Sequence, residues 1–557
     1  MARRRGPAPV SFDVSHDAAR DDGPDGAPAP RAPSGRPGRP SPRAWWAAAD
    51  RRRRRRAVAL VAGAAVVVAG AVVAGSALAD RTAADRLRAA PGGVLSLDGD
   101  LVRTWRVDAG AVAAVLPDGG LATVEDGALV AHDVASGDER WRVEVGADLL
   151  CGPAPRATSG VEWTLPVEEV TCVHGPVGAR TVTVLDASGT VVGRRELDAG
   201  TYGGPYRSVV PGADGGLVVA DYDPGLPTRL EYPTLDAMFA RLPDLPVDTD
   251  AAAVHVEDAL TAEHRSDVPL QQMTWLERNA LQCYETRSSE TNPGLPGPSI
   301  VADLTLPTPV ATATLVTYHG CGVDGTISTD GRSLGADTEA FDAGHLGTGV
   351  ERLPVPGGGY VVPTAAGSAL VRDDGTVVAE SPVQIAVPTA TDGRSADGLL
   401  GVDGDAVVEL AADGTELWRA PAERPRVVAR TADAVVVAAW DGLAAYRPQS
   451  GALRWRLPPP DGVRWVVPSA VTDGRRAAMA VRAVGQVAMS TRLVTVDLRT
   501  GAATTSSLDV DREAYVAAVA GRALLVEPTT DEGSGQDAVV VSGLAATPGS
   551  APSGPTG

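Results

Sequence analysis

The sequence predicts an all-β fold, a seven- or eight-bladed β-propeller ectodomain on a single N-terminal transmembrane helix. Three observations lead to this prediction. The 557-residue chain has 63 Gly, 44 Pro and only 3 Phe, with abundant valine, which favours many short strands over long helices. Residues 57–79 form an uninterrupted apolar segment. Beyond that segment, a unit of short strands and tight turns recurs with a spacing of 37 to 39 residues.

The N-terminal residues 1–56 are basic and poor in apolar side chains. They contain 14 Arg and 6 Asp, a net charge of +8, and we expect them to form a disordered cytoplasmic tail. The 23 uncharged residues 57–79 are long enough to cross a bilayer as a helix. Six arginines, residues 51–56, directly precede this segment and favour the cytoplasmic side. The pattern predicts a single-pass cell-membrane protein with an extracytoplasmic C-terminal domain.

The end of the apolar segment allows a second interpretation. Ala77-Leu78-Ala79 fits a signal-peptidase site, so that cleavage after Ala79 is an alternative. However, the apolar run is longer than the ~7–15 residues of a signal peptide, and the preceding 56 residues are too long for its basic region. These lengths favour an uncleaved signal-anchor, followed by a juxtamembrane linker at residues 80–93.

The chain beyond the apolar segment is strongly acidic. The whole chain has a net charge of −20, of which residues 1–56 contribute +8 and residues 57–79 contribute none. Residues 80–557 therefore have a net charge of −28. A domain of this charge repels nucleic acid, so no nucleic-acid partner is expected. All 50 basic residues are arginine. The absence of lysine excludes P-loop and Schiff-base lysine chemistry.

Four cysteines lie beyond the apolar segment, at Cys151, Cys172, Cys283 and Cys321. An even number on the oxidising side of a membrane predicts two disulfides. Proximity in the sequence favours Cys151–Cys172 and Cys283–Cys321, although four cysteines allow three pairings. The sequence has no Cys-x-x-Cys pair, which argues against a redox or zinc-ribbon site.

Short strands and tight turns alternate from Val94 almost to the end of the chain. Val112–Gly146 contains four such strands, and Arg426–Leu457 is a second copy. In three units the turn glycine is followed four residues later by tryptophan and then by arginine. These pairs are Gly137 and Trp141, Gly414 and Trp418, and Gly451 and Trp455. Versions without the tryptophan follow Gly189, Gly375 and Gly501.

Each part of this repeat has a physical role. The glycine supplies the positive φ of a tight hairpin, and the tryptophan can bury its ring between one unit and the next, with the arginine facing outward. Glycines 375, 414 and 451 are 39 and 37 residues apart, typical of a four-stranded propeller blade. Counting glycine turns gives seven or eight blades, with a further blade at residues 205–235 left open. Ring closure predicts that Val94–Val107 shares a blade with Ala523–Leu544.

The Asp/Ser-Gly turn followed by x-x-x-Trp-Arg resembles the repeat of PQQ-like (quinoprotein-type) β-propellers. The resemblance extends over most of residues 94–545, and non-catalytic propellers of the BamB-like type use the same repeat. In the enzymes of the family it implies a PQQ cofactor beneath a disulfide of adjacent cysteines, with calcium ligands from Glu, Asn and Asp. This sequence departs from that pattern, because its nearest cysteines are 21 residues apart and its only asparagines are Asn279 and Asn292.

The regular spacing breaks at residues 230–299, an insertion within the predicted propeller of residues 94–545. Asp236–Leu242 and Val268–Cys283 have helical rather than alternating patterns. Long insertions on a rigid scaffold often carry function, so this range is the first candidate for a binding surface. Residues 546–557 are expected to form a disordered tail.

The sequence contains no recognisable catalytic, cofactor-binding or metal-binding constellation. H-E-x-x-H is absent, and the repeated Asp-x-Asp pairs lack the longer run and terminal Glu of a calcium loop. We therefore expect a non-catalytic scaffold, not an enzyme, that binds a protein or cell-envelope ligand without a cofactor. The alternative is a PQQ-dependent or other propeller-borne enzyme. The oligomeric state is left open.

Overall fold

The computed structural model describes residues 78–547 with internal gaps. The chain divides into two units, Met1–Ala77 and Leu78–Gly557, and all described residues belong to the second. The predicted tail 1–56, residues 57–77 of the predicted span and residues 548–557 lie outside the described residues. Among those described, no helix combines the length and the apolar character needed to cross a bilayer. The gaps are 157–158, 205, 224–228, 233–251, 273–283, 289–299, 305, 321–322, 330, 332–352, 356–357, 365–366, 373–375, 395–397, 412–413, 460–463, 485–490, 511–512 and 531–536.

The described residues form nine antiparallel blades and one additional three-stranded sheet. The apolar faces of neighbouring blades pack together, so that buried aliphatic residues lie between sheets. Blade 1 comprises β2 (Ala111–Val115), β3 (Gly120–Glu125), β4 (Ala128–Asp133) and β5 (Glu139–Glu144). Blade 2 comprises β6 (Leu150–Gly152), β7 (Glu169–His174), β8 (Thr181–Asp186) and β9 (Val191–Glu196).

Blades 3 to 6 continue in chain order. Blade 3, which follows the short helix α2 (Ala199–Tyr202), comprises β10 (Arg207–Pro211), β11 (Gly216–Tyr222), β13 (Ala252–Asp258) and β14 (His264–Val268). Blade 4 comprises β18 (Val310–Ala311), β19 (Leu315–Gly320), β20 (Val323–Ser328) and β15 (Gln271–Gln272). Blade 5 comprises β21 (Leu353–Pro354), β22 (Tyr360–Thr364), β23 (Gly367–Val371) and β24 (Val377–Ser381). Blade 6 comprises β25 (Gln384–Ile385), β27 (Gly398–Val402), β28 (Ala406–Ala411) and β29 (Glu416–Pro421).

The last three blades complete the ring. Blade 7 comprises β30 (Arg426–Arg430), β31 (Val435–Ala439), β32 (Gly442–Tyr446) and β33 (Leu453–Leu457), with β26 (Ala390–Thr391) added in parallel to β30. Blade 8 comprises β34 (Arg464–Thr472), β35 (Arg476–Val484), β36 (Thr491–Asp497) and β37 (Ala503–Val510). Blade 9 comprises β38 (Tyr515–Val519), β39 (Arg522–Thr530), β40 (Asp537–Ala546) and β1 (Leu101–Ala109).

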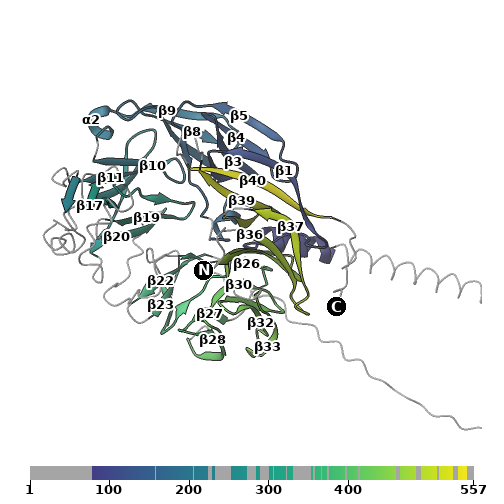
Figure 1. Cartoon of the computed structure of the whole chain (residues 1–557). Coiled ribbons are helices and arrows are strands. Elements are labelled where there is room, and N and C mark those ends of the chain that lie inside the picture. The colour runs from purple at the N-terminus through teal and green to yellow at the C-terminus, as the bar shows by residue number, and fades with distance from the viewer. Residues whose placement is uncertain are drawn as a thin grey trace, which may run out of the picture. The chain divides into compact units, whose positions relative to one another are not determined.

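The ring closes through the two ends of the propeller chain. β1 pairs with β40 in antiparallel register, from Leu101 opposite Ala546 to Ala109 opposite Val539. Figure 1 shows the purple β1 beside the yellow β40. The predicted sharing of one blade by the N-terminal and C-terminal strands is confirmed. This pairing removes the open edges that a linear array of blades would leave.

The predicted number of seven or eight blades was too low. The additional unit is blade 3, in the region that the glycine count left open. Its turn between β13 and β14 has Ala262 at φ +61°, in the backbone conformation that Gly137, Gly189, Gly414, Gly451 and Gly501 adopt in the corresponding turns of other blades. An unusual alanine in this conformation, together with residues 224–251 between β11 and β13, concealed the repeat.

The blades present two faces at the two ends of the ring. Because adjacent strands are antiparallel, first-to-second and third-to-fourth turns lie on one face, and second-to-third turns and inter-blade connections on the other. Residues 78–89 are helical and lie on the first face, where Arg86 Nε donates to Asp392 O at 3.0 Å in the β25–β27 connection. We call this the helix face and the other the distal face.

The segment that follows this helix is built into the propeller by backbone hydrogen bonds. Thr391 N donates to Pro91 O at 2.7 Å, which joins the segment to β26. Thr472 N donates to Gly92 O at 2.8 Å, and Val94 N donates to Thr472 O at 2.9 Å, which joins it to β34. The range predicted as a linker, residues 80–93, is therefore helical up to residue 89 and then fixed to blades 7 and 8.

Residues 230–299, the range expected to form one insertion, divide among three sheets. β13 and β14 belong to blade 3, and β15 is the outer strand of blade 4. β12 (Arg229–Tyr232), β17 (Ile300–Leu304) and β16 (Tyr284–Ser288) form the separate three-stranded sheet. Its strands follow β11 and precede β18, so this sheet extends from the distal face. The predicted helical segment Asp236–Leu242 and residues 273–283 lie outside the described residues.

Candidate functional site

The axis of the ring is occupied by the described residues of the connection between β6 and β7, 153–156 and 159–168, which we call the axial loop. It starts in blade 2 and reaches strands on the far side of the ring. Gly160 lies so close to Thr389, beside β26, that a Cβ at this glycine would be 1.9 Å from Thr389 O. Trp163, in the 3-10 helix η1 (Glu162–Thr164), packs on Tyr515 of β38 with ring centroids 6.1 Å apart.

A buried ion pair fixes the conformation of the axial loop. The side chain of Glu162 is fully buried and receives Arg156 N on Oε2 at 2.7 Å and Arg156 Nη2 on Oε1 at 2.7 Å. Trp163 Nε1 donates to Arg156 O at 3.0 Å. A buried charge is tolerated only when it is paired and hydrogen-bonded, and Glu162 meets both conditions.

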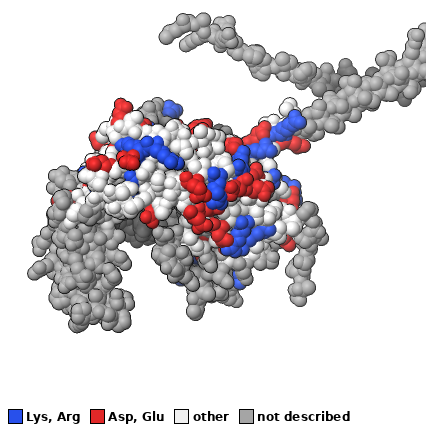
Figure 2. All heavy atoms as spheres, turned by 90° about the horizontal axis from the view of Figure 1, so that it is seen from above, with Lys and Arg blue, Asp and Glu red and all other residues white. Residues whose placement is uncertain are grey.

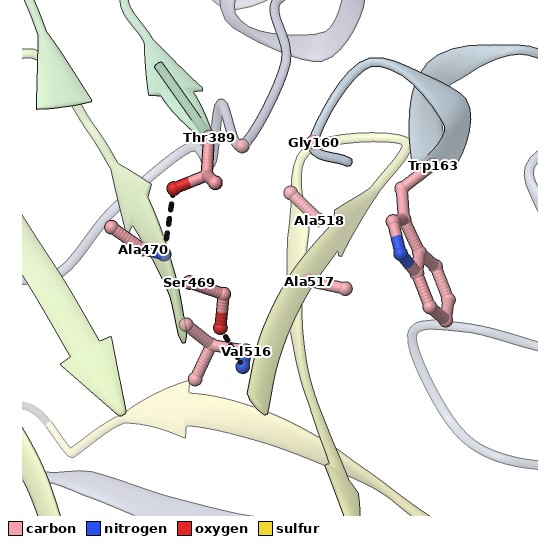
Figure 3. Close-up of a pocket in the computed structure, with 9 residues that line it drawn as sticks. Gly160, Trp163, Thr389, Ser469, Ala470, Val516, Ala517 and Ala518 are labelled. Carbon is pink, nitrogen blue, oxygen red and sulfur yellow. Dashed lines mark hydrogen bonds between the residues drawn. The ribbon is translucent and has the colours of Figure 1, made fainter. Parts of the chain in front are cut away.

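Two hydroxyl groups join the innermost strands of neighbouring blades beside the axial loop. Thr389 Oγ1 donates to Val428 O of β30 at 2.9 Å and accepts from Ala470 N of β34 at 3.1 Å. Ser469 Oγ accepts from Val516 N of β38 at 2.7 Å. Figure 3 shows Thr389 and Ser469 making the last two contacts, with Ala517 and Ala518 between them and Trp163. These bonds satisfy backbone groups that cannot pair with another strand at the axis.

The recess at this position is a packed junction and does not fit a quinone cofactor. Its wall consists of small residues and one indole, and it leaves no space for even one water molecule. Among the residues that the structure describes, no group of three or more His, Cys, Asp and Glu side chains is placed to hold a metal ion. The wall residues are Gly92, Gly160, Trp163, Thr389, Ser469, Ala470, Val516, Ala517 and Ala518.

A disulfide closes the base of the axial loop. Cys151 in β6 and Cys172 in β7 are direct cross-strand partners and form the predicted bond, with Cα atoms 4.1 Å apart. Both cysteines are buried among aliphatic residues of blades 1 and 2. The other predicted pair, Cys283 and Cys321, lies outside the described residues.

The tryptophans of the predicted repeat lie in the outermost strands, and each contacts the next blade. Their indole nitrogens donate to a carbonyl in the third-to-fourth turn of that blade. The acceptors are Ala187 O for Trp141 at 3.2 Å, Pro448 O for Trp418 at 2.6 Å and Leu498 O for Trp455 at 3.0 Å.

The motif glycines pack against tryptophan rings of the preceding blade. Gly137 contacts Trp105, Gly451 contacts Trp418 and Gly501 contacts Trp455. Gly414 contacts Glu380 O instead of a ring, because Ala379 replaces tryptophan in blade 5.

Two members of this inter-blade series escaped the sequence pattern. Trp105 of β1 donates from Nε1 to Val134 O at 3.2 Å and connects blade 9 to blade 1. The spacing of six residues between Gly99 and Trp105 obscures it. Between blades 2 and 3 the contact is inverted, because Gly193 stands where tryptophan is expected and Leu260 of the next turn fills the space.

The arginines that follow the tryptophans face outward and pair with acidic residues. Arg142 contacts Glu139 and Glu125 at 3.1 and 3.0 Å, and Arg456 contacts Asp441 at 2.8 Å. Figure 2 shows basic side chains in small groups that adjoin acidic ones. Pairs this exposed contribute about 0–1 kcal/mol each. These ion pairs therefore compensate charge on the outer strands and add little to the stability of the fold.

One acidic residue lies inside the blade 6–blade 7 contact. Glu409 of β28 is buried, receives Trp418 Nε1 on Oε2 at 2.6 Å and pairs with Arg430. Burial raises the pKa of Glu409, although the Arg430 guanidinium and the Trp418 hydrogen bond act in the opposite direction. The pair closes a structural contact between blades and is not exposed to a ligand.

The distal face carries an aromatic residue between two arginines. Trp440, in the β31–β32 turn, has Arg424 Cζ 3.9 Å and Arg464 Cζ 4.1 Å from its ring centroid. Arg424 comes from the β29–β30 connection, and Arg464 begins β34. Both arginines are exposed, and Trp440 is half-buried. The three residues are separated by 16 and 24 positions in the chain, so no local pattern in the sequence predicted this stack.

The comparisons with known proteins show only distant structural likeness. No family model matches the chain, and no curated protein matches it. Among solved structures, the dihydro-heme d1 dehydrogenase NirN in complex with DHE is 13% identical with a TM-score of 0.28. The match covers 74% of this chain and 80% of the NirN chain. AztD from Citrobacter koseri is 12% identical with a TM-score of 0.26, covering 74% and 95%. The WD40 domain of SCAP from fission yeast is 10% identical with a TM-score of 0.25, covering 80% and 95%.

Proposed function

We propose that this chain is a membrane-anchored, extracytoplasmic β-propeller of the PQQ-like repeat type. It acts as a non-catalytic scaffold that binds a protein or cell-envelope ligand on its distal face. The observation that carries the proposal is the position of residues 80–97, which are bound to the helix face and directly follow the apolar segment 57–79. These residues cover part of the helix face, which leaves the distal face as the proposed binding face.

Two further features support a binding role. The axis of the propeller is filled by the axial loop, so the position at which a propeller could hold a buried ligand is taken by Trp163 and Gly160. The three-stranded sheet extends the distal face, and the Arg424–Trp440–Arg464 stack adds two exposed arginines to it. A rigid ring that presents variable loops on one face is a common arrangement for recognition.

Membrane anchoring is tested first, with the full chain expressed in intact cells. The wild type should stay with the membrane fraction after alkaline extraction. A Val67→Asp/Val68→Asp variant should be released, because two carboxylates in the centre of the apolar segment each cost about 2.5–3.5 kcal/mol of insertion free energy. Equal retention of the two chains would overturn the proposed anchor.

The binding face is tested with a photo-crosslinking amino acid placed at exposed positions. Asp126, Asp405 and Glu423 lie in turns and connections of the distal face, whereas Ser136 and Ser450 lie in turns of the helix face and serve as matched controls. We expect adducts of defined mass from the distal positions in intact membranes and none from the controls. Adducts from the helix face alone, or catalytic turnover by the purified chain, would refute the proposed function.

A further inference from the structure

The stack of Arg424, Trp440 and Arg464 has a defined geometry. The two guanidinium Cζ atoms lie 3.9 and 4.1 Å from one ring centroid, which is the contact distance of groups stacked on an aromatic face. Because both distances are measured to the ring of Trp440, the two Cζ atoms are at most about 8 Å apart.

The connection that carries Arg424 holds a conformation unusual for this residue. Arg424 has φ +47°, in the left-handed region that glycine favours. Asp405 fixes this conformation, because its Oδ1 accepts Arg424 N at 3.1 Å and its carbonyl accepts Ala422 N at 2.9 Å. Strained backbone conformations persist where the surrounding structure enforces them, and they concentrate at binding sites.

The hydrogen-bonding edges of the two guanidiniums have no carboxylate partner among the described residues. This differs from nearby Arg456, which pairs with Asp441 at 2.8 Å, and from Arg142, which pairs with two glutamates. Stacking occupies the faces of a guanidinium and leaves its in-plane N–H groups available. The stack therefore presents two preorganised donor edges, each of which matches the two oxygens of a carboxylate.

We propose that this stack is a docking site for an extended acidic peptide with carboxylates at alternate positions. In an extended chain, residues i and i+2 point to the same side and lie about 6.6–6.8 Å apart. This spacing matches two guanidiniums separated by at most about 8 Å. The inference rests on the proposed function, in that it identifies the chemistry of a partner for the distal face.

The surroundings of the stack favour a short acidic segment over a polyanion. Glu423, Asp405 and Asp441 lie beside the arginines in the chain or in the turns that contact them, and residues 80–557 carry a net charge of −28. A long anionic polymer would meet these acidic groups, whereas two carboxylates can reach the donor edges alone.

The experiment titrates the detergent-solubilised full chain into a short fluorescent peptide with Asp at alternate positions, followed by anisotropy. We expect binding by this peptide and not by its Asn counterpart, and weaker binding by a peptide of equal charge with adjacent Asp residues. Arg464→Gln should weaken binding about three- to fivefold, the effect of losing one exposed charge pair. Arg142→Gln, which alters an arginine already paired on blade 1, should leave binding unchanged.

Arg424→Gly separates binding from folding. Glycine suits φ +47°, so this variant should unfold at the same denaturant concentration as wild type or a higher one, yet bind as weakly as Arg464→Gln. Equal binding of the Asp and Asn peptides, or equal effects of Arg464→Gln and Arg142→Gln, would overturn the proposal. So would displacement by inorganic pyrophosphate together with equal binding of alternate and adjacent Asp peptides. The titration needs no membrane, so its failure is distinct from failure of the anchoring and crosslinking tests.

Discussion

Gly189 of blade 2 lies directly against the indole of Trp141 of blade 1. A Cβ at Gly189 would be 2.7 Å from Trp141 Cδ2, and Trp141 Nε1 donates to Ala187 O, two residues before the glycine. The same relationship joins Trp105 to Gly137, Trp418 to Gly451 and Trp455 to Gly501. The ring is thus held by a contact in which one blade supplies a large flat side chain and the next supplies a position with no side chain.

The contact predicts a large effect of adding one methyl group. Gly189 has φ +82°, so Gly189→Ala places an alanine in the left-handed region, which costs about 1 kcal/mol of folding stability. The added methyl group also clashes with the Trp141 ring, and we expect a total loss of about 3 kcal/mol. Gly178→Ala is the matched control, because Gly178 has φ +91° and no atom within 4 Å of the added Cβ. Urea unfolding should show a clearly lower midpoint for Gly189→Ala. Equal midpoints would show that the ring contact does not contribute.

The sequence predicts which residue types make these contacts but not which glycine meets which tryptophan. Glycine and tryptophan four residues apart identify a turn and an outer strand, because both properties are local. The glycine under Trp141 is in the next blade, 48 positions later, and this pairing depends on how the blades stack. Strand closure between β1 and β40 was predictable, because a ring of blades has to join its ends.

Both candidate sites lack a local signal. The axial loop has neither helical nor alternating periodicity. Its position at the axis depends on contact with Thr389, more than 220 positions away in the sequence. The Arg424–Trp440–Arg464 stack takes one residue from an inter-blade connection, one from a turn and one from the first position of β34. Connections carry few constraints from periodicity, so the sequence could not show that these residues meet.

Loss of the Cys151–Cys172 disulfide should destabilise the propeller. The bond links residues 21 positions apart across β6 and β7, and closing a loop of this length stabilises a fold by about 3 kcal/mol. A Cys151→Ala/Cys172→Ala variant should unfold at a lower urea concentration than wild type. It should also be cut faster by protease within residues 153–168. An unchanged midpoint and cleavage rate would contradict this role.

The same variant also tests the second predicted disulfide. If Cys283 and Cys321 are bonded, adding a reductant should lower the unfolding midpoint of the double-alanine variant further. Alkylation of the unreduced wild-type protein should label none of the four cysteines. Labelling of Cys283 or Cys321 would show that this pairing is wrong.

Asp258 should make the stability of the propeller depend on pH in acid. Burial opposes ionisation of Asp258, but Thr261 N, the Arg265 guanidinium and Leu260 N donate to its carboxylate and lower its pKa to about 2. Because the folded pKa lies below the ordinary value of 3.8, this stabilisation is complete above pH 4 and is lost as the pH falls towards 2. It amounts to at most about 2 kcal/mol.

The pH prediction is measured with Asp258→Asn. The difference in unfolding free energy between wild type and this variant should be largest near pH 6 and should shrink steadily below pH 4. Asp138→Asn, which removes a carboxylate at an exposed turn position, is the control substitution. A gap between wild type and Asp258→Asn that persists at pH 2 would show that the carboxylate charge is not the cause.

Trp163 should be replaceable by a free aromatic molecule. Its side chain is 1% exposed and is enclosed by the axial loop, Tyr515 and the inner strands, so Trp163→Ala should cost about 3–5 kcal/mol and leave an enclosed apolar cavity. Added indole should then raise the thermal midpoint of this variant, since it binds the folded state alone. Trp141→Ala removes the same ring from a half-exposed position whose space opens to water, so indole should not restore it. Equal restoration of both variants would mean that the axial loop does not seal the centre of the ring.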